Sequence, residues 1–324
     1  MNILLTSVGR RGYLVRYFKE ALGTDGCVWG ADNSRYAPGF AYCDHRAIIP
    51  EITHPDYLDH ILGICTTHKI DILIPLIDPE LEVLSGFRGE FERRGILLLL
   101  SPQETIDIAS DKLLTYRFAQ QHGIGCPKTF TTTAEAMAAI ESGGIDWPLL
   151  VKPRHGSAST NLMYCRDRVQ LEGAFDACPQ PIIQEVVKGV EYGFDLFGDL
   201  QSRPISVYCK RKLAMRAGET DKAVSTNTPS LIAFGETLLK ALKIIGPADV
   251  DVIVDKDCPK LLEINPRFGG GYPCSHLAGA AFPHKIVALR NGKTLTPDIG
   301  ACPDGVCMLK QDEIIQPEWN GLGG

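Results

Sequence analysis

The sequence predicts an α/β fold for the first hundred or so residues and a mixed α+β fold for the rest of the chain. Short apolar runs alternate with helix-like periods in the first part, a pattern typical of a mostly parallel sheet covered on both faces. From residue 182 onward the apolar segments become longer strands, and only a few helices follow them. With 324 residues, the chain has room for two or three packed units.

In the first unit, strands and helices are predicted in regular alternation. Buried strands are expected at Ile3–Val8, Val28–Ala31, Ile72–Ile77 and Ile96–Leu100. Helices are expected at Leu14–Leu22, Tyr57–His68 and Glu80–Arg93. Ser101 then precedes Pro102 as a helix cap would, and we place the end of this domain at residue 108.

A second unit is predicted for residues 109–182 and a third for residues 183–292. Asp111 is placed to cap a helix that runs to Gln121, and Gly123 to end it. The following elements are expected at Lys128–Thr131 (strand), Ala134–Ser142 (helix), Leu149–Pro153 (strand), Leu162–Cys165 (strand) and a helix ending at Ala177. The third unit combines long strands with a helix at Pro229–Leu242 and two helices after Tyr272, and residues 293–324 form a tail with little pattern.

The composition excludes several classes of protein. A net charge of −6 lacks the basic footprint of non-specific nucleic-acid binding. No apolar run approaches the roughly 20 residues that span a bilayer, and the first charges follow the first apolar stretch, unlike a secretory signal. The 11 cysteines include no Cys-x-x-Cys pair, which favours buried free thiols in a reduced compartment. We therefore expect a cytoplasmic globular protein that binds neither nucleic acid nor membrane.

A β-hairpin is predicted between Asp249 and Asn265, where two apolar strands flank a polar turn. With Asp257 at the centre, Asp251 is paired with Glu263, six residues to either side, and Asp249 faces Asn265, eight residues to either side. These four polar side chains then share one face. The other face is expected to be an apolar wall of Val250, Val252, Val254, Leu262 and Ile264.

The polar face of this hairpin is a candidate metal site. Like charges opposite each other on neighbouring strands are destabilising, so something must offset their repulsion. Carboxylate and amide oxygens suit Mg²⁺, which completes its octahedral shell with water and substrate phosphates. Asp251, Glu263 and Asn265 are therefore candidate ligands, and Arg267 adds a guanidinium that can grip a phosphoryl group. A solvated sheet face with mixed register is the alternative.

A candidate phosphate-binding loop follows the buried strand that carries Lys152. The loop, residues 154–160, contains Gly156, Ser157 and Ser159. Such small residues let backbone N–H groups approach an anion closely. An ordinary surface loop is the alternative, and a neighbouring magnesium site favours phosphate binding.

Further candidates lie where strands end. Backbone groups of the segment after Gln184 can read adenine, and Glu185 or Glu191 can accept ribose hydroxyls; a surface charge is the alternative for each glutamate. A charged strand pair offers Arg216 and Lys222, which either face solvent or reach phosphate or a substrate carboxylate. Candidates for the acceptor substrate, at the carboxyl ends of predicted strands, are Arg10, Arg11, Asp78 and Glu80.

Taken in order, these motifs resemble those of the ATP-grasp superfamily. They are Lys112 in Ser-Asp-Lys, Lys152 in Val-Lys-Pro, Gln184-Glu185 with Glu191-Tyr192, and Glu263-Ile-Asn265-Pro-Arg267. The chain looks most like the ATP-binding halves of carbamoyl-phosphate synthase large chains and their short stand-alone relatives, over about residues 1–292. The resemblance implies a Rossmann-like pre-ATP-grasp domain (1–108), a linker helix and lid subdomain (109–182), a C-terminal catalytic subdomain (183–292) and a tail (293–324).

The resemblance also implies a role for each matching position. The nucleotide-binding set would be Lys112, Lys152, Gly156, Ser157, Ser159, Gln184, Glu185, Val186, Val187, Glu191 and Lys222. The loop 154–160 would close over the triphosphate, residues 185–187 would hold adenine and Glu191 the ribose. Asp251, Glu263 and Asn265 would bind two Mg²⁺ ions, which Mn²⁺ can replace. The catalytic set would be Arg267, Lys152 and Arg216.

The implied function is an ATP- and Mg²⁺-dependent ligase that phosphorylates a carboxylate, releases ADP and lets an amine or similar nucleophile attack the acyl phosphate. Its partners would be these small molecules, and a homodimer is left open. The alternatives are a kinase with a stable phosphorylated product and a non-catalytic ATP-binding regulatory module. A dinucleotide-dependent oxidoreductase is disfavoured, because Val8-Gly-Arg-Arg-Gly12 departs from Gly-x-Gly-x-x-Gly.

Overall fold

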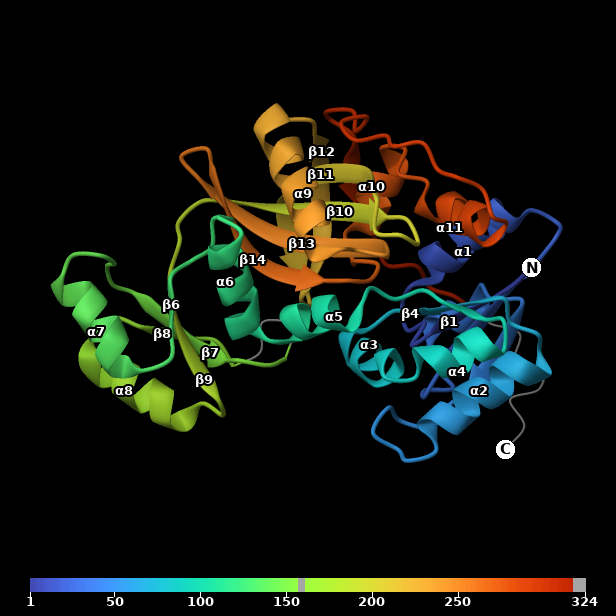
Figure 1. The fold of residues 1–324 in the computed structure, drawn as a ribbon, viewed down its shortest axis with the longest axis horizontal. Helices are drawn as coiled ribbons and strands as arrows, with labels where there is room; N and C mark the ends of the chain where they lie inside the picture. Colours follow the sequence, from blue (N-terminus) through green and yellow to red (C-terminus); the bar gives the residue numbers. More distant parts are fainter. Residues whose placement is uncertain (157–160, 317–324) are drawn as a thin grey trace.

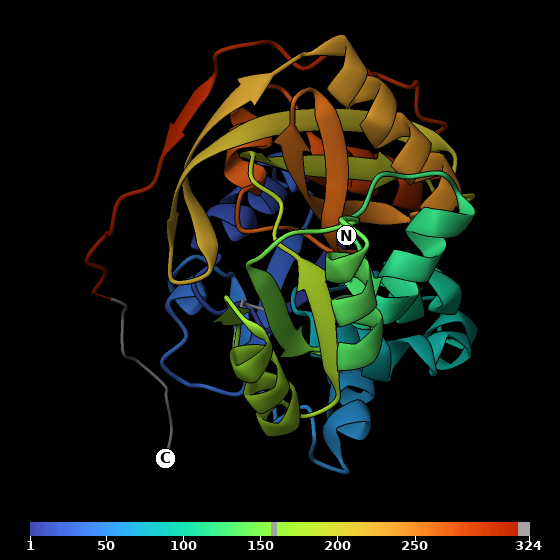
Figure 2. The ribbon, with the colours of Figure 1, turned by 90° about the vertical axis from the view of Figure 1, so that its left-hand side faces the viewer.

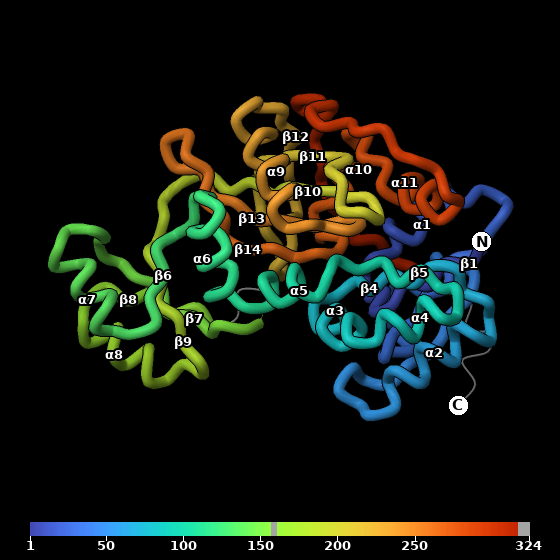
Figure 3. The backbone as a smooth tube through the Cα atoms, viewed as in Figure 1, coloured from blue at the N-terminus to red at the C-terminus, as the bar shows by residue number. Residues whose placement is uncertain are grey.

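Three β-sheets organise the part of the chain that the structure, a computed structural model, describes, residues 1–156 and 161–316. The parallel sheet and its helices lie at one end of the molecule, and the small sheet with α7 (Thr133–Glu141) and α8 (Arg168–Ala177) lies at the other end (Figure 1). The six-stranded sheet lies above and between these two ends. The tube in Figure 3 shows how α5 and α6 carry the chain from the first end toward the other two sheets.

The N-terminal sheet is parallel and has the strand order β3-β2-β1-β4-β5. Its strands are β1 (Asn2–Thr6), β2 (Cys27–Asp32), β3 (His45–Ile48), β4 (Ile72–Pro75) and β5 (Leu97–Leu98). Its helices are α1 (Gly12–Leu22), the 3₁₀ helix η1 (Pro38–Ala41), α2 (Tyr57–Thr67), α3 (Asp78–Ser85) and α4 (Arg88–Arg93). Two predictions needed correction here: β3 was missed because this edge strand is not buried and apolar, and the single helix expected at 80–93 is two short ones.

Alternate side chains of β1 enter two cores. Ile3 and Leu5 pack in the cluster that includes α1, the later helix α11 (Phe282–Arg290) and Phe197 and Tyr208 of the six-stranded sheet, whereas Leu4 packs with α2, α3 and α4. The N-terminal unit and the six-stranded sheet therefore share one hydrophobic core.

The middle unit is a four-stranded antiparallel sheet in the order β6-β9-β7-β8, covered by two helices. Its elements are β6 (Thr129–Phe130), α7 (Thr133–Glu141), β7 (Leu149–Pro153), β8 (Met163–Cys165), α8 (Arg168–Ala177) and β9 (Pro181–Glu185). The helices α5 (Gln103–Ser110) and α6 (Lys112–Gln121) lead into it. Asp111 caps α6 as predicted, whereas the Ser101 hydroxyl accepts from Ile245 N instead of capping α5. Strand β9 runs across the boundary expected at residue 182.

The third sheet is antiparallel, with the strand order β14-β13-β10-β11-β12-β15. Its strands are β10 (Val190–Gly198), β11 (Pro204–Arg216), β12 (Glu219–Thr226), β13 (Gly246–Asp255), β14 (Cys258–Asn265) and β15 (Cys307–Leu309). Its helices are α9 (Pro229–Leu242), α10 (Tyr272–Leu277) and α11 (Phe282–Arg290). Strand β15 comes from the tail in which little pattern was expected, and Figure 2 shows this C-terminal segment descending along one side of the molecule.

In the described ranges, no helix combines the length and the apolar character that a membrane span requires. The 11 cysteines are all free thiols, but only six of them are buried, because Cys258 and Cys307 are exposed and three others are partly exposed.

Candidate active site

A cleft of about 890 Å³ lies where the three units meet. It is lined by the ends of the N-terminal strands, the faces of β7 and β9, and the polar face of β13 and β14. Of the predicted site residues, the cleft brings together Lys112, Lys152, Gly156, Gln184, Glu185, Val186, Val187, Glu191, Asp251, Glu263, Asn265 and Arg267. Ser157 and Ser159 lie outside the described residues.

The hairpin β13–β14 pairs Asp251 with Glu263 and Asp249 with Asn265, the register predicted from the sequence. The turn, however, is not centred on Asp257. It is a two-residue turn in which Lys256 and Asp257 both have positive φ, 45° and 68°. The register shifts by one residue between Asp251 and Val252, and this β-bulge restores the predicted pairs.

The bulge also corrects the predicted apolar wall. Leu261 is fully buried beside Val250 and Val252, whereas Leu262 is only partly buried and lines the cleft. A period of two would place Leu262 in the core, but the extra residue of a bulge reverses which face the next side chain occupies. The polar face of the hairpin therefore also carries Leu262, which the sequence pattern assigned to the opposite face.

Burial and mutual repulsion raise the cost of charge on this face. Burial raises the pKa of Asp251, and burial together with the charge of Asp251 raises the pKa of Glu263. Lys212 Nζ lies 2.6 Å from Asp251 Oδ1 and supplies part of the compensating charge.

The donor set fits Mg²⁺ as it binds with a nucleotide. No group of three or more His, Cys, Asp or Glu side chains suited to a metal occurs among the described residues, so the protein offers no all-acid cage. Two carboxylates and one amide oxygen, from Asp251, Glu263 and Asn265, leave coordination positions for phosphate oxygens and water, which Mg²⁺ prefers to keep. The pKa values of Asp251 and Glu263 are raised, so a bound cation would stabilise the ionised form of both carboxyl groups.

Two lysines reach the cleft from the middle unit and its linker. Lys152 is 9% exposed and its Nζ donates to Gln184 Oε1 at 2.8 Å. Burial, with the nearby charge of Lys112, lowers the pKa of Lys152 to about 8. Lys112 Nζ donates to the carbonyl of Gly156, at the start of the candidate phosphate loop. Among the described residues neither ammonium has a carboxylate partner, so both remain available to an anion.

The segment predicted for adenine borders the same cleft. Glu185, at the end of β9, accepts from Lys260 Nζ of β14 at 2.7 Å and so ties the middle sheet to the hairpin. Val186 and Val187 follow it along the wall, and Glu191 lies at the start of β10. Together with Leu262, these residues form a partly apolar end of the cleft.

Arg267 lies at the other end of the polar face. Its Nη2 donates to Asp78 Oδ2 of α3 at 2.8 Å, so the ion pair joins the third unit to the N-terminal unit. Burial alone would lower the pKa of Arg267, but the charge of Asp78 raises it. The guanidinium thus remains cationic beside Asn265 and Glu263.

Two residues of the predicted catalytic and nucleotide-binding sets, Arg216 and Lys222, do not line the cleft. Arg216 is exposed and pairs with Asp221 and Asp312, and Lys222 is exposed on β12 opposite Leu309. Irregular pairing between Lys212 and Met215 in β11 changes the alternation of faces, so Met215 lines the cleft and Arg216 does not.

Two further side chains change place relative to the sequence analysis. Glu80 is fully buried, where it accepts from Thr6 Oγ1 at 2.9 Å and from the Tyr57 hydroxyl, and it does not line the cleft. Lys212, a basic residue of the charged strand pair that the sequence analysis did not single out, contacts Asp251 directly. No signal in the sequence distinguished it from the other basic residues of that strand.

Two family models match the chain. A model described as the N-terminal domain of PylC-like proteins matches residues 3–99, and one described as an ATP-grasp domain matches residues 109–271, just over half of the chain. The chain belongs to the ATP-grasp family. The predicted fold, an ATP-grasp fold preceded by a Rossmann-like parallel domain, is confirmed.

Curated relatives of this ATP-grasp protein are distant. It is 22% identical over 225 residues to the carbamoyl phosphate synthase arginine-specific large chain of Bacillus subtilis (strain 168), a match that covers 66% of this chain and 22% of that protein. The carbamoyl phosphate synthase large chain of Clostridium acetobutylicum is 21% identical over 256 residues, 74% of this chain and 24% of that protein. The chain therefore spans less than a quarter of the length of these relatives.

Solved structures share the fold at low sequence identity. The biotin carboxylase domain dimer of the Hydrogenobacter thermophilus 2-oxoglutarate carboxylase, in complex with MgADP, ADP and bicarbonate, superposes with a TM-score of 0.71 at 16% identity, covering 93% of this chain and 72% of that one. An L-amino acid ligase from Bacillus licheniformis gives a TM-score of 0.69 at 19% identity, with 94% and 77% coverage.

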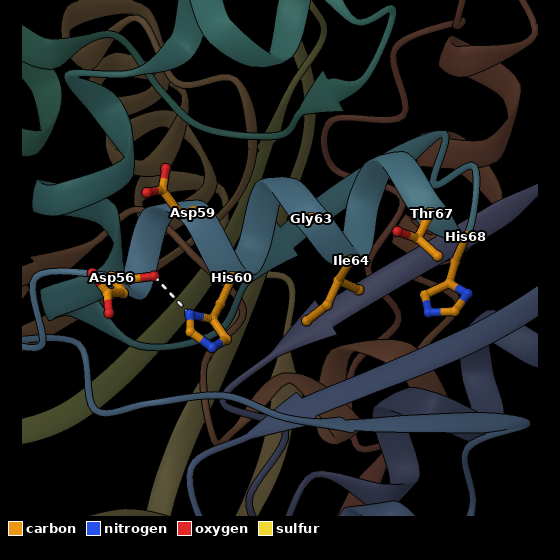
Figure 4. A pocket seen from close by; sticks show the side chains of 7 residues that line it. All are labelled: Asp56, Asp59, His60, Gly63, Ile64, Thr67 and His68. Carbon is orange, nitrogen blue, oxygen red and sulfur yellow. Dashed lines mark hydrogen bonds between the residues drawn. The ribbon is translucent and has the colours of Figure 1, made fainter.

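A second hollow, of about 510 Å³, lies on the surface of α2 (Figure 4). Its lining side chains come from α2 and the residues that flank it, from Asp56 to His68, and His60 Nδ1 lies 2.9 Å from the carbonyl of Asp56. It shares no lining residue with the cleft.

Proposed function

We propose that this ATP-grasp protein is an ATP- and Mg²⁺-dependent ligase. It phosphorylates a carboxylate to an acyl phosphate, releases ADP, and presents the acyl phosphate to an amine or a similar nucleophile. The observation that carries this proposal is the cross-strand pairing of Asp251 with Glu263 in a cleft that also holds Lys112, Lys152 and Arg267. A triphosphate needs that combination of cations and hard oxygen ligands.

The nucleotide would lie along the middle sheet. Lys112 and Lys152 would meet its phosphates, the segment from Glu185 to Val187 would hold adenine, and Glu191 would accept the ribose hydroxyls. Support comes from the ammonium groups of the two lysines, neither of which forms an ion pair with a carboxylate among the described residues, and from the partly apolar wall near Val187 and Leu262. Gly156, with φ of 105°, begins the loop that would cover the phosphates.

Asp251, Glu263 and Asn265 would hold Mg²⁺, as one or two ions, and Mn²⁺ could replace it. When bound, the metal would neutralise phosphate charge and polarise the transferred phosphoryl group. Arg267 would stabilise the same group by charge-assisted hydrogen bonds. For this, its ion pair with Asp78 must break, or its guanidinium must bind Asp78 and the phosphoryl group together. Because phosphoryl transfer depends mainly on positioning and on charge neutralisation, the residues of this cleft can supply what the step requires.

Hydroxylamine trapping tests the proposal. The protein is incubated with Mg-ATP, a pool of carboxylates and hydroxylamine, and the products are ADP and a hydroxamate if an acyl phosphate forms. A stable phosphorylated product would identify a kinase instead. AMP formation would exclude this chemistry, and the absence of any turnover, with nucleotide still bound, would identify a binding module.

A further inference from the structure

The N-terminal unit contributes its own ligand-binding corner to the cleft. In its strand order, β3-β2-β1-β4-β5, all strands run parallel, but the order in which the chain adds them reverses between β1 and β4: β2 and β3 lie on one side of β1, and β4 and β5 on the other. Open α/β sheets bind ligands outside the carboxyl ends of the strands at such a reversal. Arg11 follows β1, Asp78 follows β4, and both line the cleft.

Arg11 is the cation of this corner without a counter-charge. Asp78 already pairs with Arg267, and Asp251 with Lys212. Among the described residues no carboxylate pairs with Arg11; its Nη1 makes one long contact of 3.5 Å to the Ser7 carbonyl, and its Nε is buried with no hydrogen-bond partner. The guanidinium therefore retains donors that the protein leaves unused.

The surroundings of Arg11 favour a bound anion. Helix α1 begins at the next residue, has no acidic residue in its first turn and receives no side-chain cap, so its positive end is uncompensated. The buried hydroxyl of Tyr13, two residues after Arg11, also has no hydrogen-bond partner among the described residues. Arg10, by contrast, is exposed, pairs with Asp312 at 3.5 Å and does not line the cleft.

We propose that Arg11 binds a second anionic group, a carboxylate or a phosphate, on the acceptor whose other carboxylate is activated. This inference rests on the proposed ligase function. The guanidinium fork matches both anions in a bidentate geometry. Lys112 and Lys152 reach the cleft from the linker helix and the middle sheet, so Arg11, on the N-terminal wall, is positioned for the acceptor and not for the nucleotide.

The test compares Arg11→Gln and Arg11→Lys with the matched control Arg10→Gln. Hydroxamate formation is measured with monocarboxylates, dicarboxylates and phosphorylated carboxylates. We expect wild type to require the second anion, and Arg11→Gln to raise the KM for that acceptor about tenfold or more, the effect of one charge-assisted hydrogen bond. The KM for ATP stays unchanged, Arg11→Lys recovers part of the loss, and Arg10→Gln behaves as wild type. Activity with dicarboxylates or with phosphorylated carboxylates identifies the anion.

A binding measurement separates this inference from the ligase proposal. Succinate and 3-phosphoglycerate are titrated calorimetrically into wild type, Arg10→Gln and Arg11→Gln with ADP present. Loss of binding in Arg11→Gln alone supports the anion site. If no hydroxamate forms in that case, the result contradicts the ligase function but not the anion site. Equal binding by all three proteins, or no binding by wild type, overturns the role of Arg11, as does a wild-type preference for simple monocarboxylates.

Discussion

Lys152 shows how strongly burial acts on a single residue of this site. A lysine on a surface loop titrates near 10.4, but removal of its ammonium from water and the neighbouring Lys112 lower the pKa of Lys152 to about 8. The sequence identified the residue from its place at the end of an apolar strand. Its pKa follows from the burial of its ammonium group and from the nearby charge of Lys112, which no local pattern contains.

We therefore predict that nucleotide binding weakens as the pH rises through about 8. Below this pH the Lys152 ammonium is protonated and can meet a phosphate; above it the free protein holds a neutral amine, and the affinity for MgADP should fall about tenfold. Calorimetric titration across this range tests the effect, with Lys152→Met as the control that should lack this step. An identical pH profile for wild type and Lys152→Met would show that another group is responsible.

Glu263→Gln is predicted to separate stability from activity. Turnover should fall about 100-fold or more, because a ligand for Mg²⁺ is lost where charge is neutralised during transfer. The unfolding midpoint without metal should stay equal or rise, since the variant removes a buried carboxylate that is repelled by Asp251. Glu236→Gln, on α9 and outside the cleft, is the matched control. Wild-type activity of Glu263→Gln would contradict the assignment of Glu263 as a metal ligand.

At the scale of elements, strand irregularities decide which side chains reach the site. The bulge in β14 keeps Glu263 and Asn265 facing β13's carboxylates and moves Leu262 from the expected core to the cleft. The irregular pairing in β11 has the opposite outcome for Arg216, because it leaves this side chain outside the cleft. A bulge adds one residue without any distinctive composition, so a period-two reading of the sequence misses it.

A buried ion pair lies next to Asp249 on the same face of this sheet. Lys210 of β11 lies 2.5 Å from Asp195 of β10 and 3.8 Å from Asp249, and the Lys210 and Asp195 side chains are 1% and 3% exposed. Ser275 of α10 also donates to Asp195. Gly271 allows this packing, because a Cβ at that position would lie 2.5 Å from Lys210 Cε.

Lys210→Met should destabilise the protein by about 3–5 kcal/mol, because Asp195 would remain buried without its counter-charge. The double variant Lys210→Met/Asp195→Leu should recover most of that loss, since it removes both charges. Urea unfolding of the two variants measures the difference. Equal stability of Lys210→Met and wild type would mean that water or another group solvates Asp195.

At the scale of the whole molecule, three units meet at one cleft and are joined by ion pairs across it. Arg267–Asp78 links the third unit to the first, and Lys260–Glu185 links the third to the second. The segment after β15 adds contacts on the outside, where Asp312 meets Arg216 and Arg10. A ligand in the cleft would therefore contact all three units at once.

MgADP should accordingly stabilise the entire chain. A ligand that binds only the folded state at 100 times its Kd raises the free energy of unfolding by about 2.7 kcal/mol. Thermal unfolding with ADP and Mg²⁺ should show this shift, and EDTA should remove the metal-dependent part. No shift with saturating nucleotide would contradict nucleotide binding in the cleft, and a shift that EDTA leaves unchanged would contradict the metal site.

The amino-acid sequence by itself determined the kinds of elements and the residues that carry the chemistry. Apolar periodicity identified β1, β2, β4 and β7, and the symmetry of the polar positions around residue 257 predicted the pairing of Asp251 with Glu263. Both depend on neighbours along the chain or on a single hairpin, so local spacing is enough to reveal them.

Only the tertiary structure decided which charged residues share the cleft. It separated Arg11 from Arg10, placed Lys212 rather than Arg216 beside Asp251, and buried Glu80 behind the N-terminal sheet. These outcomes depend on bulges, on strand order and on the packing of three units, which bring together residues more than a hundred positions apart. A charged side chain looks the same in the sequence whether it meets solvent, a counter-ion or a ligand, and its three-dimensional surroundings make the difference.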